Sequence, residues 1–345
     1  MERRRKRPCA GHRLAWKKFG ILLAATGLAA SSGCRDPDVS DRLASYRTGV
    51  EEVLGLEASP PYRVVLSLPE RRARILPVPE HTIGPFDFLA TIGCRLSEVI
   101  ASRNGSLGRV LEPTRRLAYE VDVIRAGEAC LPSLSEARAG RLETILNEKK
   151  HALARHAWNA VWLDAELERF LSSGPSHLIG GIDATDGPRQ LRAAAAAVRA
   201  SDVDALEDAF EQLRDDSPAG PRLRRVARAA NDLRRTVEAI GALSVSTCGA
   251  RERGLVRTFE ERFVPARGEL AELDRDGLAL SGAVEELFRA LDAVEPSESM
   301  RDYREAVAGG GGRSGAAARL RSAIVDHARA MGGVLEVCGE MPGRA

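Results

Sequence analysis

The chain has 345 residues, of which 51 are Lys or Arg and 49 are Asp or Glu, and its formal net charge is +2. Residues 1–33 hold eight of the basic residues and one acidic residue, which leaves 43 basic and 48 acidic residues and a charge near −5 for the remainder. A net negative charge on residues 34–345 argues against a protein that binds nucleic acid through a basic surface. Aromatic residues make up only 4% of the chain, so the core must consist mainly of Leu, Val, Ile and Ala, a composition that favours helices.

The first 33 residues have the three parts of a secretory signal peptide. Eight basic residues precede a ten-residue apolar run, Ile21 to Ala30, and small residues occupy positions 29–33. The run would span about 15 Å as a helix, half of the roughly 30 Å hydrocarbon core of a bilayer. The sequence therefore predicts a signal peptide at 1–33 that is removed on export, and disfavours both a membrane-spanning helix and a buried helix of a cytosolic protein.

Ser-Ser-Gly-Cys at 31–34 is similar to the lipobox of bacterial lipoproteins, in which the cysteine is lipidated and becomes the mature N-terminus. Such boxes usually carry Leu, Val or Ile where this chain has Ser31. The alternative is simple cleavage nearby, without a lipid. Two acyl chains on Cys34 would anchor the protein durably, since each buried CH₂ contributes about 0.8 kcal/mol. Residues 34–36 would then be the lipid anchor and tether.

Residues 37–345 are predicted to form one helical domain, an all-α multi-helix bundle with a sub-boundary near the loop 174–188. Apolar residues recur every three or four positions, as on one face of a helix. The predicted helices, in chain order, are 37–57, a hairpin of 86–103 and 113–128, 134–172, a pair at 188–200 and 202–214, a helix ending near 248, 253–294 with a kink at Pro265, and 316–338. The prolines at 60, 61, 69, 77, 79 and 85 end the first helix and predict a short extended segment across the bundle.

Four cysteines remain in the body: Cys94, Cys130, Cys248 and Cys338. An even number in an oxidising compartment indicates two disulfides, for which three pairings exist. The predicted hairpin brings Cys94 toward Cys130, and Cys248 and Cys338 end two predicted long helices, so these two pairs are favoured. Free buried thiols are the alternative. A zinc site is disfavoured because no pair has CxxC spacing and no histidine lies within four residues of any of the four.

The turn of the hairpin carries four candidate ligand-binding residues, Arg103, Asn104, Ser106 and Arg109. Guanidinium groups and backbone N–H groups at such a turn can hold a small anion. The alternative is a plain Asn-Gly turn whose arginines are solvated or paired with acidic neighbours.

No other pattern predicts catalysis, a metal site or a cofactor. His151 and His156 are five residues apart, so they do not share a helix face, which predicts ordinary surface histidines. His327 shares a face with apolar residues of the last helix and is predicted to pack in the core. The chain has no GxSxG, no HExxH and no phosphate-binding loop.

Four stretches resemble an uncharacterised family of proteobacterial lipoproteins, the domain of unknown function three-thousand-and-eighty. They are CRLSEVIASRNGSLGRV at 94–110, RRLAYE at 115–120, TFEERFVPARGELAEL at 258–273 and HARAMGGVLEVCGEMP at 327–342. The resemblance covers most of the chain after the leader. It implies a helical protein of the cell envelope and supplies no catalytic residue.

These features predict a lipid-anchored envelope protein that faces the periplasm and serves as a binding or scaffold module. Its expected partners are the membrane, through Cys34, and another envelope protein, with no nucleic acid. By resemblance to lipoproteins generally, Arg35 rather than Asp after the cysteine favours the outer membrane over the inner membrane.

The alternative function is an enzyme that acts on an envelope substrate such as peptidoglycan or phospholipid. Such an enzyme needs acidic, basic or nucleophilic groups that converge in a cleft. The residues that could converge near the hairpin are Glu98, Arg103, Arg109 and Tyr119.

Overall fold

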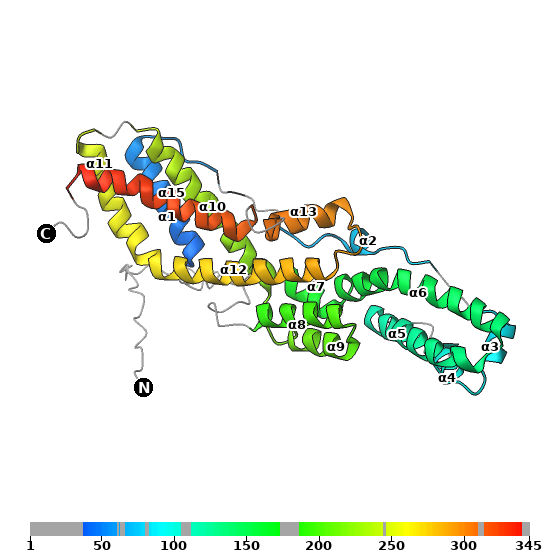
Figure 1. Ribbon diagram of the computed structural model, residues 1–345. Helices are drawn as coiled ribbons and strands as arrows, with labels where there is room; N and C mark the ends of the chain where they lie inside the picture. The colour runs from blue at the N-terminus through cyan, green and yellow to red at the C-terminus, as the bar shows by residue number, and fades with distance from the viewer. Residues whose placement is uncertain are drawn as a thin grey trace, which may run out of the picture. The chain divides into compact units, whose positions relative to one another are not determined.

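The computed structural model describes residues 37–60, 62, 66–79, 83–104, 112–172, 186–243, 246–309 and 314–339. These residues all belong to one compact unit that begins at Pro37. The described ranges contain helices and no strand, which confirms the all-α prediction (Figure 1). None of the helices described is long and apolar enough to cross a bilayer. The predicted signal peptide, Cys34 and most of the loop 174–188 lie outside the described residues.

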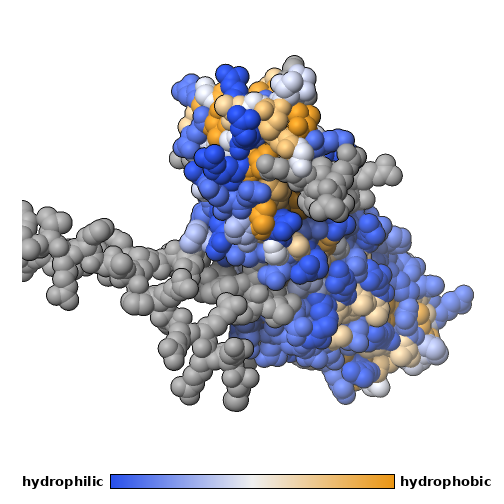
Figure 2. Space-filling model, turned by 90° about the vertical axis from the view of Figure 1, so that its left-hand side faces the viewer, coloured by the Kyte–Doolittle hydropathy of each residue, from blue (hydrophilic) through white to orange (hydrophobic). Residues whose placement is uncertain are grey.

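Three long helices and a shorter one form the first group of elements. They are α1 (Val39–Leu54), α10 (Ala219–Gly241), α15 (Ala316–Val337) and α11 (Ala250–Thr258). Helices α10 and α15 pack along each other over most of their length, and α1 packs against α10. These four helices lie together at one end of the unit (Figure 1). Figure 2 views this end directly: hydrophobic residues gather near the top, and hydrophilic residues cover most of the remainder.

The second group contains the predicted hairpin, whose second arm is α5 (Pro113–Cys130), and also α6 (Glu136–Trp162), which follows α5 through the 3-10 turn η1 (Leu131–Ser133) and packs along it. Helix α4 (Arg95–Asn104) packs against α5. The short helix α3 (Pro85–Ala90) lies at the far end of the hairpin (Figure 1).

Five further helices lie between these two groups or beside them (Figure 1). They are α7 (Ala165–Leu171), α8 (Gly187–Ala200), α9 (Val203–Gln212), α12 (Arg267–Ala290) and α13 (Glu298–Val307). Helices α8 and α9 pair as predicted, and α12 contacts α8 as well as α10 and α15. The sequence patterns did not predict α13.

The ends of α1 follow from local chemistry. Asp38 caps the helix, because its Oδ1 accepts hydrogen bonds from the backbone N–H groups of Ser40 and Asp41 at 2.9 and 3.1 Å. The C-terminal cap is Gly55, whose φ of 67° suits glycine. The helix therefore ends before the prolines at 60 and 61, which were predicted to stop it.

Two helices predicted as continuous are interrupted. The first arm of the hairpin breaks into α3 and α4 at a turn that contains Gly93, whose φ is 96°. Leu89 of α3 and Ile92 of the turn are exposed. The helix predicted at 134–172 breaks after Trp162, and Asp164 caps α7 by accepting from two backbone N–H groups at 2.9 Å.

The helix predicted at 253–294 is interrupted near its expected kink. A π-helical turn, η3 (Phe259–Phe263), and a 3-10 turn, η4 (Val264–Ala266), separate α11 from α12. Pro265 has no N–H to donate and its ring disfavours a regular helix at this point, which accounts for the irregular turns. In addition α10 ends at Gly241, so Cys248 lies in the loop before α11 and does not end a long helix.

The proline-rich segment before the hairpin is largely irregular and contains one short helix, α2 (Arg71–Arg74). It lies against α6: the Trp158 indole N–H donates to the Arg74 carbonyl at 2.7 Å. The Asn159 side chain also bonds both backbone groups of Leu76, each at 2.8 Å. The predicted path of this segment across the bundle is confirmed here.

Small residues let α10 approach its neighbours closely. At Gly220, in the first turn of α10, an added Cβ would overlap the backbone carbonyl oxygen of Ser172. At Gly277 of α12 an added Cβ would lie 2.9 Å from Val226 of α10. The backbone separation at these points therefore depends on the absence of a side chain.

We predict that Gly220→Ala lowers the free energy of unfolding by about 2 kcal/mol, because the backbone of residue 172 must move to admit a methyl group. Gly241→Ala is the matched control in the same helix, since an added Cβ there meets nothing within 4 Å. The control should be neutral or stabilising by up to about 1 kcal/mol. Chemical denaturation of the two variants measures the difference, and equal midpoints would contradict the close approach.

Candidate functional site

The structure brings one predicted anion-binding residue into a charged cluster. Arg103, near the end of α4, lies over the ring of Tyr119, with its guanidinium carbon 4.7 Å from the ring centroid. Its Nη1 is also 4.0 Å from the Glu120 carboxylate. Ser106 and Arg109 lie outside the described residues, as does the side chain of Asn104, so the predicted four-residue site stays a prediction.

Glu120 is the centre of this cluster and is only 1% exposed. Lys149 of α6, also buried, donates to its Oε2 at 2.8 Å. Arg116, one turn earlier on α5, lies 3.0 Å from Oε1. One carboxylate thus holds together three helices, with Arg103 from α4, Arg116 from α5 and Lys149 from α6.

The cluster carries more positive than negative charge. Three cations, Arg103, Arg116 and Lys149, surround the single carboxylate of Glu120, and the two guanidinium groups remain partly exposed. Burial raises the pKa of the adjacent Tyr119, although the Arg103 guanidinium opposes this effect. The arrangement can stabilise a small anion at the surface beside Arg103 and Arg116, or it can act purely as a clamp between helices.

His156 is not the surface histidine that was predicted. It is buried, and its Nε2 lies 3.9 Å from the Glu120 carboxylate. The cause is the tight packing of α6 on α5, which the helical spacing alone did not indicate. His151 is exposed and contacts the Asn147 carbonyl at 2.7 Å. Within the part of the chain that the structure describes, no group of His, Cys, Asp and Glu could hold a metal ion.

The residues suggested for a catalytic alternative converge only in part. Arg103 and Tyr119 are together, as described above. Glu98 is exposed, and Arg109 lies outside the described residues.

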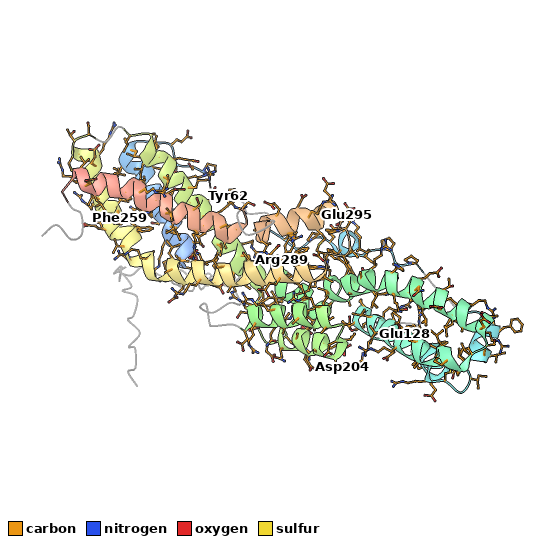
Figure 3. All side chains as sticks on the ribbon, viewed as in Figure 1. Tyr62, Glu128, Asp204, Phe259, Arg289 and Glu295 are labelled. Atoms are coloured by element: carbon orange, nitrogen blue, oxygen red, sulfur yellow. A yellow bond between two sulfur atoms is a disulfide. The ribbon has the colours of Figure 1, made fainter. Side chains whose placement is uncertain are left out.

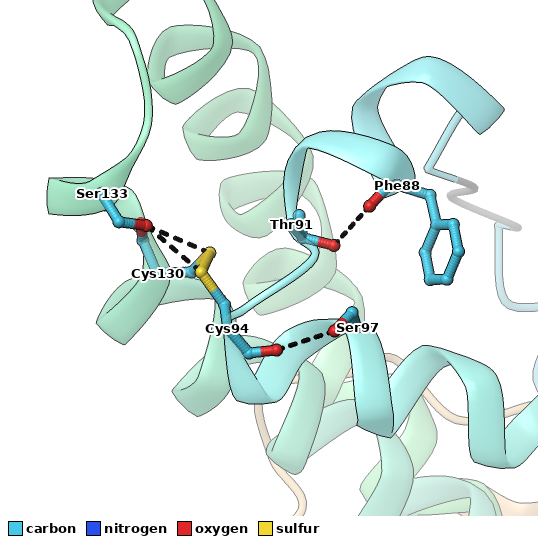
Figure 4. Close-up of a disulfide and its surroundings, with 6 residues drawn as sticks. All are labelled: Phe88, Thr91, Cys94, Ser97, Cys130 and Ser133. Atoms are coloured by element: carbon cyan, nitrogen blue, oxygen red, sulfur yellow. Dashed lines mark hydrogen bonds between the residues drawn. A yellow bond between two sulfur atoms is a disulfide. The ribbon is translucent and has the colours of Figure 1, made fainter.

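Both favoured cysteine pairs are bonded. Cys94 joins Cys130 with an S–S distance of 2.09 Å, and Cys248 joins Cys338 at 2.05 Å. The first bond fastens the start of α4 to the end of α5 near Ser133 (Figure 4). The second fastens the loop before α11 to the end of α15. Each disulfide therefore closes one end of the unit.

His327 is packed in the core, as predicted. Its Nε2 lies 2.9 Å from the Tyr46 hydroxyl of α1, and the ring of Phe263 is 4.4 Å away between centroids. Burial lowers the pKa of His327 from 6.5 to about 4, so this imidazole is neutral in the folded protein near neutral pH. These packing contacts indicate that His327 has a structural role in the core.

A groove between α10 and α15 is a concave feature that sequence reasoning missed. It has a volume of about 270 Å³. Its floor is formed by the alanines 227, 230 and 323, and Tyr62 lies beside it (Figure 3). Alanines on facing helices are the only sequence signal for such a groove, and they are equally typical of close helix packing.

One buried polar group of this groove lacks a partner. Asn231 is 7% exposed, and its Oδ1 accepts from Arg234 at 3.1 Å. Its Nδ2 has no hydrogen-bond acceptor among the residues described. An unpaired buried N–H costs about 1–3 kcal/mol, which a ligand oxygen could recover. Arg234 and Arg319 line the same groove, but so does Asp326, and Arg234 is paired with Glu238, so the lining offers donors to a ligand oxygen without selecting a negatively charged ligand.

The chain belongs to an uncharacterised family. A family model described as "Protein of unknown function (DUF3080)" matches residues 43–342, which is nearly all of the described unit. No curated protein and no solved structure matches the chain.

The contacts of the Glu120 cluster predict that the stability of the fold depends strongly on the Glu120 carboxylate. Glu120→Gln should lower the free energy of unfolding by about 3 kcal/mol, because it leaves the buried Lys149 ammonium unpaired. The control is Glu128→Gln on the same helix, since Glu128 pairs at 2.6 Å with Lys150 but both side chains are nearly half exposed. The control should cost less than about 1 kcal/mol. Similar losses in the two variants would show that Lys149 is solvated.

His327 predicts a pH-dependent stability. Between pH 6.5 and pH 4 the unfolded chain binds a proton at this imidazole and the folded chain does not, so stability falls as the pH falls through this window. The loss should approach about 3 kcal/mol and should be absent in His327→Gln. His151→Gln, at an exposed position, should keep the wild-type pH profile. Denaturation curves across the window measure both.

Proposed function

We propose that this protein is a lipid-anchored binding module of the cell envelope that faces the periplasm. Residues 1–33 would direct export, and the lipidated Cys34 would hold the body at the membrane through the tether at 34–36. The helical unit from Pro37 onward would carry the binding surface.

The two disulfides support the envelope location. Disulfides persist in oxidising compartments such as the periplasm and are rare in the cytosol. Here the paired cysteines are 36 and 90 residues apart in the sequence. In the chain-entropy model each loop of this size contributes about 4 kcal/mol to stability. Arg35 after the cysteine favours the outer membrane, by resemblance to other lipoproteins.

The groove between α10 and α15 is the observation that carries the binding role. It combines an alanine floor, a buried amide N–H of Asn231 without an acceptor, and the guanidinium groups of Arg234 and Arg319. Ligand sites in proteins commonly join an apolar surface to a few placed polar groups. The ligand class that fits is a small molecule or chain segment with an apolar body and a carboxylate or carbonyl oxygen over Asn231.

A photo-crosslinking amino acid at Ser322, which lines the groove, tests this proposal in intact Gram-negative cells. The expected result is a specific adduct at Ser322 in membrane fractions and none at Ala328, an exposed position of the same helix outside the groove lining. Cys34→Ala should release the protein from the membrane fraction. Without reductant, the four cysteines of the helical unit should not react with an alkylating agent, because both pairs are disulfide-bonded.

Two results would contradict the proposal. Recovery of protein with residues 1–33 intact and all cysteines reduced would contradict the proposed envelope location. Equal labelling at Ser322 and Ala328 would remove the groove as the binding surface while leaving the location untouched.

A further inference from the structure

Three large apolar side chains protrude from the far end of the hairpin. Phe86 and Leu89 of α3 are 84% and 57% exposed, and Ile92 in the following turn is 66% exposed. They are the three most exposed large hydrophobic residues among those described. We name this set the α3 knob. Their three-residue spacing places them on one side of the chain.

The α3 knob is held firmly although nothing described covers it. Arg141 of α6 donates to the Asp87 carboxylate of α3 through two nitrogens at 3.1 and 2.8 Å. Thr91, which is buried, donates from its hydroxyl to the Phe88 carbonyl at 2.7 Å (Figure 4). The Cys94–Cys130 bond then ties the turn to α5. The three apolar side chains are therefore exposed on a segment that these contacts attach to α5 and α6.

The charged residue of α3 is neutralised by a partner. Asp87 pairs with Arg141 of α6 at 2.8 Å, and Arg141 together with nearby Arg138 lowers the pKa of the Asp87 carboxyl. A paired carboxylate gives little attraction to a strongly charged surface. Burial of the apolar side chains must then supply most of the affinity for any partner.

The size of the α3 knob decides between partners. Three side chains at these exposures present roughly 400 Å², about half of the ~800 Å² that each protein contributes to a stable complex. A second copy of the chain or a rigid protein partner would need more surface. A lipid bilayer needs no complementary shape, and insertion of apolar side chains at its interface scales with apolar area.

We propose that the α3 knob inserts into the interfacial layer of a phospholipid bilayer and gives the protein a second membrane contact. This inference rests on the proposed lipid anchor, because an anchored chain is already held near the bilayer and even a weak second contact becomes effective. The contact would orient the helical unit on the membrane.

The test uses residues 34–345, the chain that remains after the predicted cleavage, with Cys34→Ser, so that neither an acyl chain nor the apolar run at 21–30 contributes, and vesicles of phosphatidylcholine with brominated acyl chains. Phe86→Trp places an indole in the α3 knob, and Leu56→Trp places one at a half-exposed site after α1. Bromine quenches an indole only within the bilayer. The indole from Phe86→Trp should be quenched, that from Leu56→Trp should not, and added salt should leave the result unchanged.

A second pair of variants measures the affinity. Replacing Phe86, Leu89 and Ile92 together by Ser should reduce vesicle partitioning by at least about tenfold. The matched control replaces three other exposed apolar residues, Leu56, Ile75 and Val325, by Ser and should leave partitioning unchanged. Circular dichroism checks that all variants stay helical.

The outcomes separate this inference from the proposed anchor. No quenching from Phe86→Trp in protein whose wild type is lipidated would overturn the knob insertion and leave the anchor. Quenching from Phe86→Trp, together with a wild-type chain that carries no lipid on Cys34 when isolated from cells, would leave the knob insertion and overturn the anchor. If the Ser variants lost a crosslinked protein partner without any change in partitioning, the α3 knob would be a protein-docking surface and the lipid proposal would be wrong.

Discussion

The close approach of α10 to its neighbours is the constraint on which the rest of the unit depends. A chain with few aromatic residues cannot fill wide gaps between helices, so it must bring helix backbones together and gain many small contacts instead. Gly220 and Gly277 allow this at the points where a side chain would collide with a neighbour. Small side chains also leave a groove between α10 and α15, because the alanines that form its floor do not fill the space between the two helices. Packing and candidate binding surface therefore share one cause.

Buried charges fix the register of helices that small residues alone would leave free to slide. Arg47 of α1 bonds Asp232 of α10 at 2.9 Å, and the Glu120–Lys149 pair ties α5 to α6. Arg222 and Asp276 link α10 to α12 in the same way. Such pairs add little net stability, since desolvation offsets the attraction, but any other register would leave charges unpaired and is strongly disfavoured. The arginines of these pairs thus have a structural use in this fold.

The surfaces that carry the proposed functions lie on different elements. The groove belongs to α10 and to the first half of α15, whose other end the Cys248–Cys338 bond fastens, and the α3 knob lies beside the Cys94–Cys130 bond. Each disulfide therefore braces the helices that present one of these surfaces. A module with a membrane-contacting end and a separate ligand surface fits the proposed role at an envelope membrane, where orientation on the bilayer decides which face meets a partner.

Periodicity determined most of the helices, because it depends on spacing along the chain, and the hairpin pattern indicated the Cys94–Cys130 pair. With four cysteines, that pair leaves Cys248 to bond Cys338, although Cys248 does not end a long helix as expected. Helix interruptions at Gly93 and Asp164 were not apparent from spacing, since apolar residues continue on both sides of each break. The partners of Glu120 and the burial of His156 depend on which helices meet, and the groove and the α3 knob depend on which apolar residues find nothing to pack against. Local patterns along the sequence decide which segments are helical. Only the tertiary structure decides which of their side chains remain uncovered, because exposure is a property of neighbours that are distant in the chain.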